Sequence, residues 1–113
     1  MRAITAISTP VGAGGIGILR VSGEDALKVS DTIFICKDGE PLSKRALVMR
    51  FGTFDAGDFR DKGYAVYFPA AKAYTGEDTV EFYLHGGVRI MQGALDAALR
   101  AGARLAERGE FTK

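Results

Sequence analysis

The sequence predicts an α+β domain, built as a single mixed β-sheet of about five or six strands with two main helices packed mainly against one face. Three observations lead to this fold. In several short segments, inward-facing and outward-facing residues alternate with the period of a strand. In two longer segments, apolar residues recur with the period of a helix. Neighbouring strand segments are joined partly by short turns and partly through helices, which mixes antiparallel and parallel connections.

The chain has 113 residues, so we assign residues 1–113 to one domain. The sequence contains no internal repeats, no low-complexity stretches and no internal linker. It stops at Lys113 without a terminating signal, and we therefore expect it to be part of a longer protein.

The first two predicted strands cover residues 3–8 and 16–22, and a glycine-rich loop joins them. Ser22 is expected to cap the first helix, with Asp25 three positions later completing an approximate capping box. Three apolar residues at helical spacing define the core face of that helix: Ala26, Val29 and Ile33.

Two more strands are predicted at residues 47–52 and 64–68, where outward and inward residues alternate. The loop between them begins at residues 55–58 and includes the charged residues that follow, so these strands should pair antiparallel. A further strand covers residues 79–84.

The longest helix follows His85-Gly86-Gly87, and Gly102 is expected to close it. Leu105 lies in a last short extended piece. The residues expected on the core face of the helix are Val88, Met91, Leu95, Ala98 and Leu99.

Two of the predicted strands carry a charged residue at their centre, where a sheet normally holds apolar side chains. Arg20 interrupts the apolar strand at 16–22, and Glu81 faces away from Val80 and Phe82 in the strand at 79–84. Burying an ionised group is costly unless a partner compensates it. Arg20 and Glu81 therefore either pair with each other or bind a ligand.

The first alternative is a cross-strand ion pair. The second needs a ligand that offers paired N–H donors to Glu81 and anionic or acceptor groups to Arg20. A pterin ring meets the first requirement, because its amino group and ring N–H form a two-pronged donor edge suited to a carboxylate. The glutamate tail of a folate would suit a guanidinium, and Tyr83, on the face of Glu81, could add aromatic contact or core packing.

Composition excludes several classes of function. The net charge is +1 with scattered basic residues, so the chain carries no electrostatic footprint for nucleic acid. No apolar run approaches the ~20 residues that span a bilayer, and the first residues do not resemble a signal peptide. The single cysteine, Cys36, cannot form an intramolecular disulfide, which favours a cytoplasmic setting, and it is read as a small buried hydrophobe.

Other motifs favour structural interpretations. Residues 12–17 match G-x-G-x-x-G, but a strand follows them where a dinucleotide site needs a helix, so we interpret them as a flexible turn. His85-Gly86-Gly87 could bind an anion at a helix start, although a strand-to-helix turn that needs glycine dihedrals, with His85 hydrogen-bonded locally, is favoured. The chain offers no metal site, no serine triad and no phosphate loop.

Taken together, the motifs of the chain resemble a known family, the bacterial tRNA modification GTPases called TrmE or MnmE, at their N-terminal end. The match runs over essentially the whole chain, in order and at compatible spacing. The segments that carry it are AISTP (6–10), GGIGILRVSG (14–23), YTGEDTVE (74–81), HGG (85–87), GARLA (102–106) and GEFTK (109–113).

The resemblance implies a domain that binds a tetrahydrofolate derivative, either 5-formyl- or 5,10-methylene-tetrahydrofolate, and forms a homodimer. The folate-contacting arginine and glutamate of the family match Arg20 and Glu81. For the whole protein it implies addition of a carboxymethylaminomethyl group to C5 of the wobble uridine of certain tRNAs, with a flavin-dependent partner protein. GTP, Mg²⁺ and K⁺ would bind in a separate GTPase domain that is absent from this chain.

The chain departs from the family pattern at two places, where Val11 and Arg108 stand instead of the usual prolines. Neither departure touches the expected site. A further folate contact of the family lies just past residues 109–113, so the pocket here could be incomplete.

Two rival functions stay open beside folate binding. One is a purely structural dimerisation domain in which Arg20 and Glu81 form an internal ion pair. The other is a folate-dependent transferase acting alone, which is disfavoured because no general acid or base is evident in addition to the ligand anchors. We therefore expect no catalytic residue within these 113 residues.

Overall fold

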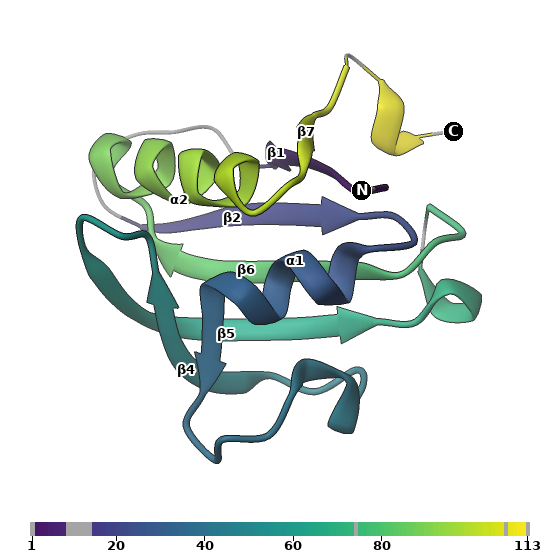
Figure 1. The fold of residues 1–113 in the computed structure, drawn as a ribbon, viewed down its shortest axis with the longest axis horizontal. Helices are drawn as coiled ribbons and strands as arrows, with labels where there is room; N and C mark the ends of the chain where they lie inside the picture. Colours follow the sequence, from purple (N-terminus) through teal and green to yellow (C-terminus); the bar gives the residue numbers. More distant parts are fainter. Residues whose placement is uncertain (1, 9–14, 74, 108, 113) are drawn as a thin grey trace.

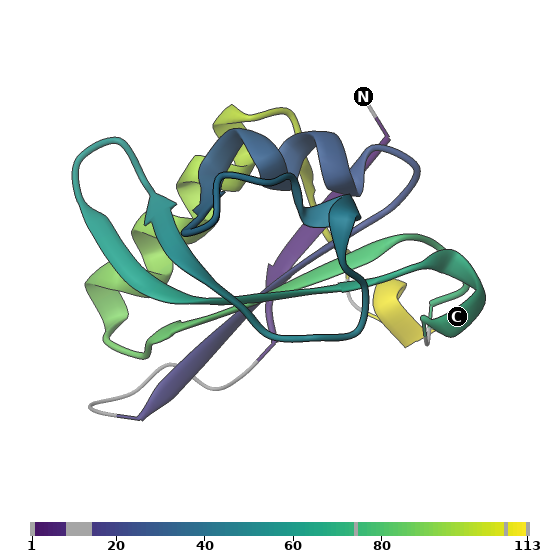
Figure 2. The same cartoon turned by 90° about the horizontal axis from the view of Figure 1, so that it is seen from below.

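The computed structural model describes residues 2–8, 15–73, 75–107 and 109–112. Across these residues the strands form a seven-stranded sheet in the order β3-β4-β5-β6-β2-β1-β7. The helices α1 (Ala26–Ile33) and α2 (Val88–Arg100) both lie on one side of this sheet, as Figures 1 and 2 show. The predicted α+β fold, one mixed sheet with two helices packed against one face, is confirmed.

Neighbouring strands pair antiparallel except β1 and β7, which are parallel. Short 3₁₀ turns connect or follow the strands at η1 (Leu42–Lys44), η2 (Ala70–Lys72) and η3 (Glu110–Thr112). The strands are β1 (Ile4–Ile7), β2 (Ile16–Ser22), β3 (Phe34–Cys36), β4 (Arg50–Asp55), β5 (Arg60–Phe68), β6 (Thr79–His85) and β7 (Arg104–Leu105).

The sequence did not predict β3, which directly follows α1. Phe34 and Cys36 point into the core and Ile35 points outward, so the segment has the period of a strand but only three residues. So short a run is hard to distinguish from the end of a helix. Burial raises the pKa of the Cys36 thiol, in keeping with its interpretation as a buried hydrophobe.

The hairpin of β4 and β5 pairs antiparallel as predicted, but its strands are displaced from their predicted bounds. β4 begins at Arg50, three residues after Leu47, whose φ of 64° is incompatible with a strand. β5 begins at Arg60, because the charged residues expected in the loop instead pair with the end of β4. Charged side chains are acceptable there because they point away from the core or lie at the edge of the hairpin.

The predicted cap of α1 is wrong. Ser22 is the last residue of β2, and the helix begins after Asp25, whose side chain makes no capping hydrogen bond. The Asp25 carboxylate instead accepts a hydrogen bond from the backbone N–H of Arg2 at 2.6 Å. The local sequence is compatible with a capping box, but the tertiary contacts of both residues override it.

The core lies between the helices and the covered face of the sheet. The predicted core face of α1 is confirmed, because Ala26, Val29 and Ile33 are buried. On α2 the prediction holds for the buried Met91 and Ala98 and is wrong for Val88, which is 62% exposed in the first turn of the helix. Leu95 and Leu99 are partly buried at the margin of the core.

Gly102 ends α2 as predicted, with a φ of 117° that favours glycine. Its N–H donates to the Leu99 carbonyl at 3.1 Å, and the Ala103 N–H donates to the Ala98 carbonyl at 3.0 Å. These two bonds form a Schellman motif, which satisfies the last carbonyls of the helix and turns the chain into β7.

The close contact of β3 with β4 yields a first prediction. A Cβ added to Gly52 would lie 2.2 Å from the Ile35 carbonyl oxygen, and backbone cannot move aside cheaply. We expect Gly52→Ala to lower the free energy of unfolding in urea by about 2–3 kcal/mol. Gly87→Ala is the control, because it meets nothing within 4 Å and should cost less than about 1 kcal/mol at its helix N-cap. Equal losses in the two variants would contradict this packing.

Candidate functional site

Arg20 and Glu81 come together because β2 and β6 pair antiparallel in a register that places them directly opposite one another. Their sequence neighbours Leu19, Val21 and Phe82 point into the core beneath the helices and are fully buried. Since side chains alternate along a strand, both charged residues point to the opposite, open face of the sheet. The two sequence-predicted site residues are therefore neighbours, on the face that the two helices leave uncovered.

The two side chains form a complete ion pair. Oε2 of Glu81 accepts hydrogen bonds from Nε of Arg20 at 2.8 Å and from Nη2 at 2.5 Å. The arginine side chain is 30% exposed and the glutamate side chain 14% exposed, so the pair is only partly screened by solvent. The first of the two sequence-based alternatives, a cross-strand pair, is thus what this structure contains.

Two aromatic residues complete the surroundings of the pair. The Tyr83 hydroxyl donates to Oε1 of Glu81 at 2.5 Å. Burial, reinforced by this bond and by the negative charge of Glu81, raises the pKa of Tyr83 far above its usual value, so the hydroxyl stays a donor. On the other side, the guanidinium carbon of Arg20 lies 5.5 Å from the centroid of the Phe111 ring in η3, a cation–π contact.

The hydrogen bonds of Glu81 limit what else it can bind. A carboxylate offers about four lone-pair positions, two on each oxygen. Arg20 occupies both positions of Oε2, and Tyr83 occupies one position of Oε1. A ligand that donates to both oxygens at once would therefore have to displace one of the two Arg20 hydrogen bonds, which frees part of the guanidinium for the same ligand.

A cavity of about 270 Å³ lies beside the ion pair. It extends from Arg20 and Glu81 in the sheet, past Phe68 and Thr79 at the paired ends of β5 and β6, to the η2 turn. The residues that line it are Arg20, Phe68, Lys72, Ala73, Thr75, Thr79 and Glu81. It combines a carboxylate, two cationic side chains and an aromatic wall.

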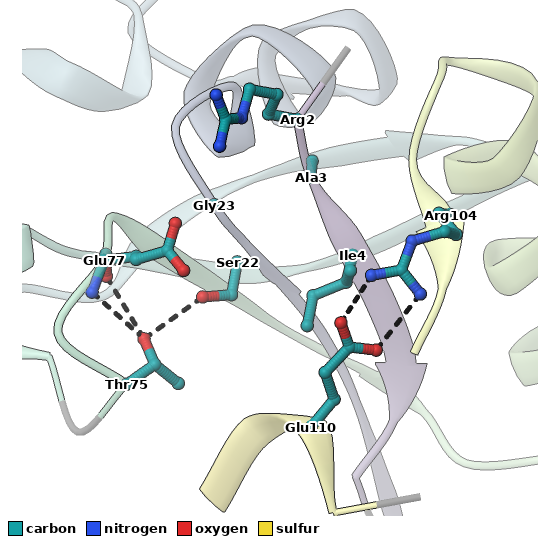
Figure 3. A pocket seen from close by; sticks show the side chains of 9 residues that line it. All are labelled: Arg2, Ala3, Ile4, Ser22, Gly23, Thr75, Glu77, Arg104 and Glu110. Atoms are coloured by element: carbon teal, nitrogen blue, oxygen red, sulfur yellow. Dashed lines mark hydrogen bonds and ion pairs between the residues drawn. The ribbon is translucent and has the colours of Figure 1, made fainter. Parts of the chain in front are cut away.

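A second cavity, of about 380 Å³, lies next to the first and is drawn in Figure 3. Two of its charged residues are engaged with each other, because the Arg104 guanidinium of β7 pairs with the Glu110 carboxylate of η3. The complete lining consists of Arg2, Ala3, Ile4, Ser22, Gly23, Thr75, Glu77, Arg104 and Glu110.

Three hydroxyl groups separate the two cavities. Ser22 Oγ lies 3.1 Å from Thr75 Oγ1 and 3.0 Å from Thr79 Oγ1, and the two threonine hydroxyls are 3.1 Å apart. Sequence reasoning missed this cluster because it assigned Ser22 to a helix cap. The signal that could have found it is the outward position of Ser22 and Thr79 at facing strand ends, two residues from Arg20 and Glu81.

The other sequence motifs take structural roles. The N–H of His85 donates to Oδ2 of Asp61 at 3.1 Å, and its ring Nδ1 lies 2.7 Å from Oδ1. The histidine is therefore hydrogen-bonded, but to a residue of β5 and not locally as predicted. The expectation that the turn needs glycine dihedrals is wrong for Gly87, whose φ is −64°. Of residues 12–17, which match G-x-G-x-x-G, residues 12–14 lie outside the described residues, while Gly15 has a φ of 76° and residues 16–17 already belong to β2.

Within the described part of the chain, no group of three or more His, Cys, Asp or Glu side chains is arranged to hold a metal ion. Among the helices of that part, none is long and apolar enough to cross a membrane.

Comparison with known proteins points to one family. The family model described as "GTP-binding protein TrmE N-terminus" matches residues 3–113. Among curated proteins, the "tRNA modification GTPase MnmE" of Symbiobacterium thermophilum is 46% identical over 113 residues, covering 97% of this chain and 25% of its own length. The proteins of the same name from Desulfotalea psychrophila and Aquifex aeolicus are each 44% identical, covering 97% of this chain and 24% of their own length.

The partial burial of the ion pair predicts a measurable coupling between its members. In a double-mutant cycle with Arg20→Ala and Glu81→Ala, we expect a coupling free energy of about 1–2 kcal/mol from urea unfolding, between the values for exposed and for buried pairs. The control cycle uses Arg2 and Glu24. Nε of Arg2 lies 3.6 Å from Oε1 of Glu24, and the two side chains are 81% and 63% exposed. That pair should couple by less than about 0.5 kcal/mol. A central coupling no larger than the control would show that the pair is not formed in solution.

Proposed function

The chain belongs to the family of TrmE N-terminal domains, and on this premise we propose that residues 1–113 form the folate-binding and dimerisation domain of a tRNA modification GTPase. The observation that carries the proposal is the Glu81 carboxylate, held at the wall of the 270 Å³ cavity on the open face of the sheet. A carboxylate in a partly apolar cavity is suited to a ligand with two adjacent N–H donors.

In this proposal, the pterin ring of a tetrahydrofolate derivative donates its amino group and ring N–H to Glu81. The residues present fit that ligand, because Oε1 has one unused lone pair and Oε2 gains one when Arg20 releases a single hydrogen bond. The freed guanidinium N–H then donates to an acceptor on the ligand, while Phe68 supplies an apolar wall. The ligand is 5-formyl- or 5,10-methylene-tetrahydrofolate, which supplies a one-carbon unit when bound.

The roles of Arg20 and Glu81 are therefore binding and orientation. Glu81 fixes the pterin edge, and Arg20 contributes positive charge and hydrogen bonds. Tyr83 positions Glu81 by holding Oε1, with Tyr83 itself anchored in the sheet. We assign no catalytic residue to this chain.

The chain spans about a quarter of the length of the curated relatives it matches. We assign the remaining steps to the rest of the protein. There a separate domain would hydrolyse GTP with Mg²⁺ and K⁺, and the full-length protein would act in the cytoplasm with a flavin-dependent partner. Together they would add a carboxymethylaminomethyl group to C5 of the wobble uridine of tRNA. The name of the relatives, tRNA modification GTPase, supports a role in tRNA modification.

We place the dimer contact on the open face of the sheet, with a second copy of this chain as the partner. Ile35, Phe51 and Tyr64 project from the neighbouring strands β3, β4 and β5 and are 62%, 40% and 43% exposed. Met49, just before β4, is 56% exposed, and the Phe51 and Tyr64 rings contact each other at 5.3 Å. Exposed apolar patches of this kind mark interaction surfaces.

A second function has a specific observation in its favour. The Arg20–Glu81 pair is complete without a ligand, as a purely structural dimerisation domain would require. In that case the pair contributes to stability alone, and folate does not bind. The two functions differ in one measurable quantity, the affinity for folate.

Titration calorimetry with 5-formyltetrahydrofolate separates these functions. We expect the unmodified chain to bind the ligand, and Glu81→Ala to weaken binding by at least about tenfold through the loss of charge-assisted hydrogen bonds. The control is Asp61→Ala, which removes the carboxylate that binds His85 and does not line the cavity. Unchanged affinity in Glu81→Ala would eliminate the role given to Glu81, and absence of binding to the unmodified chain would favour the structural domain.

The dimer contact makes a separate prediction. We expect the unmodified chain to sediment as a dimer in analytical ultracentrifugation, and Phe51→Glu to shift it to monomer by placing a charge in an apolar contact. Lys28→Glu is the control, because Lys28 is exposed on α1, on the opposite side of the sheet from the apolar patch (Figure 2). A monomer at every concentration would argue against the contact, and so would a dimer that withstands Phe51→Glu.

A further inference from the structure

Lys72 is a cationic residue on the ligand cavity that has no carboxylate partner among the residues the structure describes. The described residues that line the cavity carry three ionisable side chains, and two of them, Arg20 and Glu81, neutralise each other. No ion pair of the described residues includes Lys72. The cavity therefore has a net positive charge, and Lys72 is its source.

The position of Lys72 places this charge away from the pterin edge. Thr79 lies two residues before Glu81 in β6, which corresponds to about 7 Å along a strand. Phe68 is the strand partner of Thr79, and Lys72 follows in the η2 turn beyond the end of β5. Figure 1 shows this turn past the tip of the β5 arrow. Glu81 and Lys72 thus come from different parts of the cavity lining, the middle of β6 and the η2 turn.

The size of the cavity requires part of the ligand to leave it. A volume of about 270 Å³ falls just below the ~300–1,000 Å³ of pockets that enclose a small molecule. It therefore suits a ring system but not a ring system with a long substituent. Lys72 and Ala73, in and next to the η2 turn, line the part of the cavity away from the sheet, so we expect the substituent to leave toward this turn.

The neighbouring cavity does not offer an equivalent anchor. Both arginines that line it already have a carboxylate beside them, Glu110 for Arg104 and Glu24 for Arg2. The three hydroxyls between the cavities have one proton each to donate. Their acceptors are one another and the Glu77 carbonyl oxygen, which Thr75 and Thr79 contact. They are neutral and already have enough acceptors, so they do not attract an anion.

We propose that Lys72 binds the carboxylates of the glutamate tail of the folate and makes the cavity select glutamylated pteridines over the bare pterin ring. This inference rests on the folate-binding function proposed above and adds a specificity residue to it. The ammonium group attracts each carboxylate of the tail, so a longer oligoglutamate tail binds more tightly. Because the contact is at the solvent-exposed rim, it weakens as salt is added.

The test compares three ligands by titration calorimetry: 6-methyltetrahydropterin, which lacks the tail, 5-formyltetrahydrofolate, and the triglutamate form of 5-formyltetrahydrofolate. We expect Lys72→Ala to weaken binding of 5-formyltetrahydrofolate about three- to tenfold, the range for one partly exposed charge contact. The loss should be larger for the triglutamate and absent for 6-methyltetrahydropterin. Lys72→Arg should retain the preference for the tail.

The control variant is Lys62→Ala. Lys62 is an exposed lysine of β5 that donates to Thr53 Oγ1 at 3.0 Å and does not line the cavity, so its loss should leave all three affinities unchanged. If Lys72→Ala binds 5-formyltetrahydrofolate as tightly as the unmodified chain, while Glu81→Ala binds it more weakly, the role of Lys72 is overturned. The proposed folate site would then still stand. An equal loss for the bare pterin would also overturn the role of Lys72. If the unmodified chain binds none of the three ligands, the folate-binding function and this inference both fail.

Discussion

The hydrogen-bonded ion pair between Arg20 and Glu81 is the interaction on which the account of this domain depends. Two opposite charges are tolerated in the middle of a sheet because the strand register places them face to face and because they point away from the helix-covered core. The same register leaves their outer edge on the wall of a cavity. The same arrangement therefore offsets the cost of burying the two charges and keeps the Glu81 carboxylate accessible to a ligand.

Tyr83 connects this pair to the rest of the open face. Its hydroxyl holds Glu81, while its strand partners are Ile18 on β2 and Tyr64 on β5, and Tyr64 is in turn opposite Phe51 on β4. The proposed folate site and the proposed dimer contact thus share one row of side chains across four strands. A substitution in that row should be tested for both properties, because a change in one can reach the other through Tyr83.

The sequence predicted the features that depend on periodicity and on charge, and it was less informative about those that depend on distant contacts. The outward direction of Arg20 and Glu81 follows from alternation alone, and the closure of α2 at Gly102 follows from the need for a positive φ. The cap at Ser22 was mistaken, because a motif read locally cannot reveal that this serine ends a strand and bonds to hydroxyls some fifty residues away. Lys72 and Phe111 were missed for the same reason, since no local pattern places the η2 and η3 turns beside β2 and β6.

The most direct test of the central claim is a crystal structure of this chain with bound 5-formyltetrahydrofolate. The account predicts that the pterin amino group and ring N–H lie within hydrogen-bond distance of the two Glu81 oxygens, with Arg20 keeping one of its present bonds to Glu81 and turning the other toward the ligand. A ligand bound elsewhere, with both Arg20 bonds intact and the cavity beside them empty, would contradict it.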